Sequence, residues 1–139
     1  MTTRAPAVKA ALLTAFQAAA PLATVTWGHP GVDTADGDFA FLDKARVVQD
    51  WAALGRQRRD ETIEIEAVVL ARSADTARDV EQRAWDLAGL LEQKLRDDPT
   101  LGDVCLYSGV TQAAQANFSD GPQAYLAQIV LTIQARTRI

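Results

Sequence analysis

The chain has little of what catalysis, metal binding or disulfide bonding requires. Its 139 residues include one cysteine, Cys105, and one histidine, His29. One cysteine cannot form an intrachain disulfide, and its apolar neighbours Val104 and Leu106 predict a buried, unreactive thiol. His29 stands before Pro30 with no second histidine, Cys–His pair or triad pattern, so we interpret it as a loop residue. We therefore expect no catalytic group, no bound metal and no cofactor.

The chain also lacks basic excess and long apolar runs. Its net charge is −4 and its pI is about 4.9. A broad nucleic-acid-binding face needs clustered Lys and Arg, so this composition argues against one. No apolar run approaches membrane-spanning length, and the first residues do not form a signal peptide because Lys9 and Gln17 interrupt the apolar stretch.

What is present is the composition of one ordinary folded domain. Hydrophobic residues make up 48% of the chain and charged residues 23%, as in globular proteins generally. The length fits a single domain over residues 1–139.

Hydrophobic periodicity and turn residues divide the first half. We predict, in order, a helix at Pro6–Ala20, a short strand at Val25–Gly28, a loop over 29–38, strands at Phe39–Leu42 and Ala45–Leu54, and a polar connector at Gly55–Glu61. Asp33, Asp36 and Asp38 look faintly like a calcium loop. Gly37 is misplaced for one and the terminal glutamate is missing, so we interpret the segment as a solvated loop.

The second half carries the clearest patterns. Apolar and polar residues alternate at the start of a strand over Thr62–Arg72, where Glu64 and Glu66 form a solvated face. An amphipathic helix follows at Asp75–Arg96, capped by Ser73, Asp75 or Thr76 and ended by Pro99. We predict a strand at Val104–Val110, a long connection over Thr111–Pro122 and a closing strand at Tyr125–Ile139.

These elements predict an α+β fold. An antiparallel sheet of about four to five strands, with both helices on one face, is the simplest closed arrangement. We expect Ile129, Leu131 and Ile133 of the closing strand to face Leu87 and Leu91 of the second helix.

Two groups of residues could lie in the core or at an interface. Aromatic side chains are enriched at interfaces, yet at least two of Trp27, Trp51 and Trp85 are expected in the core. The cluster of Arg56, Arg58 and Arg59 is offset by Asp60 and Glu61. It is either a solvated hairpin tip or a polar contact with a partner.

Several short motifs resemble one family. They are Val25-Thr26-Trp27-Gly28 after the first helix, Arg59-Asp60-Glu61 before a long strand, Val80-Glu81-Gln82-Arg83-Ala84-Trp85 in the second helix, and Asp98-Pro99-Thr100-Leu101-Gly102 after it. With the closing strand, they resemble tail terminator proteins of long-tailed bacteriophages, also called tail completion or head–tail joining proteins. The family usually has a second glycine where this chain has Asp103.

The resemblance implies a hexameric ring of α+β subunits that acts in the virion, at the tail–neck junction, after assembly in the host cytoplasm. Such a ring caps the tail tube, stops its polymerisation and docks to the neck or head-completion protein, while DNA passes through without specific binding. The resemblance implies no reaction and no cofactor. We predict interface residues in the loops and connectors: Trp27, His29, Asp33, Asp36, Arg56, Arg58, Arg59, Asp60, Asn117 and Asp120.

Two alternatives remain open at this point. One is a head-completion or stopper protein in the neck, which also forms a ring of small domains. The other is a small ligand-binding or enzymatic α+β domain, which needs a pocket with convergent polar groups.

Overall fold

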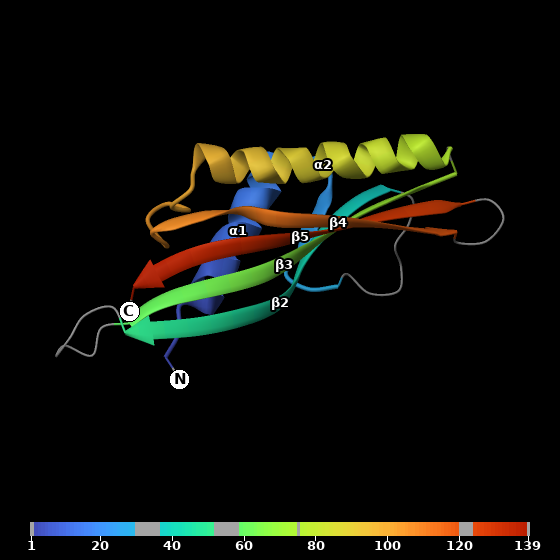
Figure 1. Cartoon of the computed structure of the whole chain (residues 1–139). Helices are drawn as coiled ribbons and strands as arrows, with labels where there is room; N and C mark the ends of the chain where they lie inside the picture. The colour runs from blue at the N-terminus through green and yellow to red at the C-terminus, as the bar shows by residue number, and fades with distance from the viewer. Residues whose placement is uncertain (1, 30–36, 52–58, 75, 120–123, 139) are drawn as a thin grey trace.

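The computed structural model describes residues 2–29, 37–51, 59–74, 76–119 and 124–138. The elements follow the predicted order of helix, short strand, two strands, helix and two strands (Figure 1). Their bounds are α1 Ala5–Ala19, β1 Thr24–Thr26, β2 Gly37–Trp51, β3 Arg59–Ser73, α2 Ala77–Asp97, β4 Tyr107–Ser119 and β5 Tyr125–Arg138.

The strands form one five-stranded sheet in the order β1-β2-β3-β5-β4. β1 runs parallel to β2, and the other neighbouring pairs are antiparallel. The predicted α+β class is thus confirmed, with one parallel pair added to a mostly antiparallel sheet. Both helices contribute to a single core on one face of this sheet.

The period-two pattern of β3 produces that core directly. Ile63, Ile65 and Ala67 are buried toward the helices, while Glu64 and Glu66 lie on the opposite face. Farther along the strand the opposite face is apolar too. There Val68 and Leu70 are buried with other apolar residues in a second, smaller cluster.

α2 packs on β5 and its neighbours through the expected stripe. Leu87 and Leu91 are buried in the same core cluster as Ile129, Leu131 and Ile133. Of the alternative caps, the structure uses Thr76, whose side chain accepts a hydrogen bond from the Asp79 N–H at 3.3 Å.

The prediction for the residues around β4 was wrong. The segment expected to be a long connection, Thr111–Pro122, is strand as far as Ser119, and β4 begins at Tyr107 rather than Val104. β4 is the last strand in the sheet order, and its residues 111–117 are exposed on both faces. An exposed strand of small and polar residues has no alternation from which to recognise it. Cys105 accordingly lies before the strand, not within it.

The boundaries near residues 37–61 also differ from expectation. A single strand, β2, is found where two shorter strands were predicted. Its pairing with β3 shifts register between Leu42 and Ala45, the place where the sequence pattern indicated a gap between two strands. β3 begins at Arg59, so the end of the predicted polar connector is strand and Glu61 is fully buried. The predicted loop over 29–38 ends by Gly37, where β2 starts.

The tryptophan prediction was wrong as well. Trp27 and Trp85 are 45% and 40% exposed, so neither is a core residue. Trp85 lies beside the leucine stripe of α2, but it projects toward the edge strand, where its Nε1 donates to Gln115 Oε1 at 2.6 Å. The side chain of Trp51 lies outside the described residues.

Candidate functional site

Glu61 is the centre of a buried polar network at one end of the sheet. Its Oε1 accepts hydrogen bonds from the Arg4 backbone N–H at 2.9 Å and from Thr137 Oγ1 at 3.2 Å. Its Oε2 accepts one from Gln49 Nε2 at 2.8 Å. One carboxylate thus joins the start of α1 to β2, β3 and β5.

The hydrogen bonds decide the ionisation of Glu61. Burial raises the pKa of this carboxyl, but donors from Gln49, Thr3 and the Arg4 backbone outweigh burial and hold the pKa below its ordinary value. Glu61 therefore stays charged at neutral pH and acts as an acceptor that fixes three strands and the N-terminal segment. It is not a poised general acid.

Asp60 makes ion pairs within the chain. Its Oδ1 lies 2.8 Å from Arg138 Nε, and its Oδ2 lies 3.5 Å from Arg136 Nη2. The hydrogen bond from Arg138 is the main reason why the pKa of Asp60 is lowered. Neighbouring Arg59 donates from Nη1 to Gln49 Oε1 at 3.3 Å. Both residues were predicted as interface contacts, and both have intramolecular partners.

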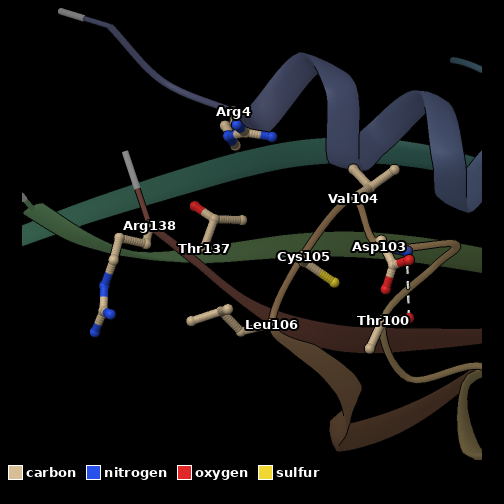
Figure 2. A pocket seen from close by; sticks show the side chains of 8 residues that line it. All are labelled: Arg4, Thr100, Asp103, Val104, Cys105, Leu106, Thr137 and Arg138. Atoms are coloured by element: carbon tan, nitrogen blue, oxygen red, sulfur yellow. Dashed lines mark hydrogen bonds between the residues drawn. The ribbon is translucent and has the colours of Figure 1, made fainter.

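A cavity of about 320 Å³ opens beside this network (Figure 2). It is lined by Arg4, Thr100, Asp103, Val104, Cys105, Leu106, Thr137 and Arg138. Burial raises the pKa of the Cys105 thiol, and Asp98 adds to that effect, so the thiolate is scarce at neutral pH. In Figure 2 the side chain of Arg138 points away from Cys105. Neither burial nor Arg138 therefore activates the Cys105 thiol as a nucleophile.

The turn after α2 has an unusual backbone. Leu101, Gly102 and Asp103 all have left-handed φ values, +51°, +68° and +66°. The Asp98 side chain holds the turn by accepting from the Gly102 N–H at 3.3 Å, and the Thr100 hydroxyl accepts from the Asp103 N–H at 3.3 Å. The motif Asp98–Gly102 thus forms a compact turn that is held by hydrogen bonds between its own side chains and the backbone.

An apolar groove of about 260 Å³ lies between the α1–β1 connection and α2. Leu22 is fully exposed and Leu90 is 51% exposed on its walls. Arg83 and Asp38 also line the groove, and they form an ion pair in which Arg83 Nη2 lies 2.7 Å from Asp38 Oδ1. Exposed leucines at a groove are typical of protein contacts. Neither leucine was among the predicted interface residues.

The remaining predicted interface residues divide between described and undescribed segments. Trp27 is exposed beside β1 with Lys9 Nζ 4.7 Å above its ring, and His29 packs edge-on against Phe41 at 5.1 Å. Asn117 lies on β4 and donates from Nδ2 to Glu81 Oε1. Five other predicted interface residues lie outside the described residues: Asp33, Asp36, Arg56, Arg58 and Asp120.

The described ranges also bear on metal binding and on membrane crossing. No group of three or more His, Cys, Asp or Glu side chains there is placed to hold a metal ion. Neither helix combines the length and hydrophobicity that crossing a membrane requires.

Comparison with known proteins gives a structural relationship only. The sequence matches no protein-family model and no curated protein. Among solved structures, the fold is similar to a chain in the "Virion of native gene transfer agent (GTA) particle". The TM-score is 0.63 and the identity 14%, and the match covers 100% of both chains. The similarity thus extends over the full length of both chains.

Proposed function

We propose that this chain is a structural virion protein, a tail terminator whose copies form a hexameric ring on the finished tail tube. The observation that carries the proposal is the fold that it shares, over its full length, with a chain of a gene transfer agent virion. The tail-terminator motifs in the sequence point to the same class of protein. The partners are the tail tube protein below the ring and the neck or head-completion protein above it.

The surface chemistry supports an assembly role rather than an enzymatic one. The groove at Leu22 and Leu90 is mostly apolar. Its charged lining residues, Asp38, Arg83 and Asp86, bond to groups of the chain itself, because Arg83 pairs with Asp38 and Gln82 donates to Asp86. A site for a polar substrate needs polar groups that converge on the substrate. The cavity near Cys105 contains a thiol whose pKa is raised rather than lowered. The net charge of −4 suits a ring through which DNA slides without being held.

The proposal is tested by inactivating the gene for this chain and examining the particles that are then assembled. We expect tubes of irregular, excessive length and heads that do not join them, both reversed by supplying the intact gene. Tails of normal length joined to heads would contradict it. Normal tails beside heads that lose their DNA would indicate the alternative role of a stopper on the head side.

A further inference from the structure

The two outer strands of the sheet differ from ordinary sheet edges. β1 and β4 are the first and last strands in the sheet order, so each has one side without an in-sheet partner. On β4 this side is a long row of backbone N–H and C=O groups, whereas β1 has only three residues, and its Val25 C=O accepts a hydrogen bond from Gln17 Nε2 at 3.2 Å. Proteins usually protect such rows with charged residues, proline or bulges, because an open edge pairs with any extended chain.

β4 has almost none of this protection. Its thirteen residues, Tyr107–Ser119, include no Asp, Glu, Lys, Arg, His or Pro. Its one irregularity lies between Val110 and Gln112, near its start. The following residues through Asn117 are exposed, small or amide-bearing, and they can approach another strand closely.

The opposite edge has a protected part and an unprotected part. β1 covers only Phe39–Phe41 of β2. The rest of β2 is charged, with Asp43, Lys44, Arg46 and Asp50, and it contains the irregularity after Leu42. β1 and its flanks, Pro21–Gly28, carry no charge at all. The uncharged edges of the described sheet are therefore β1 and β4.

Most of the large exposed apolar side chains lie near these same two edges. In the described part of the chain, such residues number eight. Leu22 and Trp27 lie beside β1, with Leu90 across the groove. Trp85, Leu106, Tyr107 and Tyr125 lie beside β4, and Val48 lies on the charged part of β2. In Figure 1, α2 lies above the strands of the sheet.

We infer that the occupant of each edge is a second copy of this chain, with the β4 edge of one subunit paired to the β1 edge of the next. This inference rests on the proposed ring. Two unlike open edges, used once each, make a head-to-tail contact that repeats around a ring. A β4–β4 contact would stop at two copies and leave Leu22 and Trp27 exposed. In the head-to-tail contact, the Leu22–Leu90 groove receives apolar side chains from the neighbour's β4 edge.

Chemical cross-linking between defined edges tests the inference. In a Cys105→Ser background, one preparation carries Ala114→Cys on β4 and another carries Thr24→Cys on β1. Both positions are exposed. With a short bis-maleimide, we expect dimers when the preparations are mixed and none from either alone. A chain with both cysteines should give a ladder of oligomers. Ala116→Cys provides a second β4 position if Ala114→Cys does not fold.

The matched control is Ala45→Cys, an exposed position on the charged part of β2. Mixed with Ala114→Cys, it should stay unlinked. Linking of Ala114→Cys to itself, equal linking to position 45, or no linking to Thr24→Cys would each overturn the inference. The proposed function fails separately. If inactivating the gene leaves tail length normal but the double-cysteine chain still gives a ladder of oligomers, the edge pairing stands and the proposed function fails. If inactivation disrupts tail length but the edges do not cross-link, only the edge pairing fails.

Discussion

At the scale of the residue, Glu61 shows what sequence patterns omit. A glutamate at the end of a charged stretch is expected in solvent, yet this side chain is 0% exposed. Its partners at Arg4, Gln49 and Thr137 are 57, 12 and 76 residues away in the chain. No local pattern brings such donors together. Only the assembled sheet shows that a charged group is needed at this position.

Glu61→Gln should lower the free energy of unfolding at pH 7 by about 1–3 kcal/mol, because the amide –NH₂ cannot accept from these donors. The folded pKa of Glu61 lies below the unfolded value of 4.5. The carboxylate's contribution is therefore fully present above pH 4.5 and is lost as pH falls through the folded pKa. Urea unfolding at several pH values checks this. A gap between variant and wild type that does not narrow in acid would contradict it.

Asp103 occupies a left-handed position, with φ of +66°, where the resembling family usually has glycine. Glycine adopts this conformation without a Cβ clash, so Asp103→Gly should stabilise the protein by up to about 1 kcal/mol. Thermal unfolding measures the change. The same substitution at Asp86, within α2, is the control and should destabilise by about 0.5–1 kcal/mol. Equal effects at both sites would show that the turn carries no strain.

At the scale of the element, the strands and the helix that bury one face are the ones that the sequence predicts well. β3, β5 and α2 each bury one face, so Ile63, Ile129 and Leu87 lie in patterns that a sequence reveals. β4 buries little, and although its start lies within the predicted strand Val104–Val110, its residues 111–119 were mistaken for a connection. On the candidate surface, Trp27 and Asn117 were predicted as interface residues, but Leu22 was not, because a single exposed leucine in a connection belongs to no periodic pattern. The lack of charge across Tyr107–Ser119 was the available signal.

Leu131→Ala should lower the free energy of unfolding by about 2–5 kcal/mol, since this side chain is buried in the core between sheet and helices. Thr132→Ala, on the opposite face of β5, is the matched control and should change stability by no more than about 0.5 kcal/mol. Denaturant unfolding compares the two. A loss below about 1 kcal/mol at Leu131 would mean that this face is not tightly packed.

At the scale of the whole molecule, the charged segment before β3 is expected to set the register of the assembly. Changing Arg56 and Arg58 together to glutamate, while leaving Arg59 bonded to Gln49, should give a folded subunit that assembles poorly. Exposed ion pairs contribute only about 0–1 kcal/mol each, so the effect should be on specificity and tail regularity. Electron microscopy of tails measures it. Tails of normal length joined to heads would identify these arginines as solvated.

We propose that copies of this chain form one ring between the tail tube and the neck. Its fold is similar, over the full length of both chains, to a chain of a gene transfer agent virion. A cryo-electron microscopy map of the intact particle tests the claim most directly. We expect a single six-fold ring of this chain on the head-proximal end of the tube. A chain found on the head side of the neck, repeated along the tube, or absent from the particle would contradict the account.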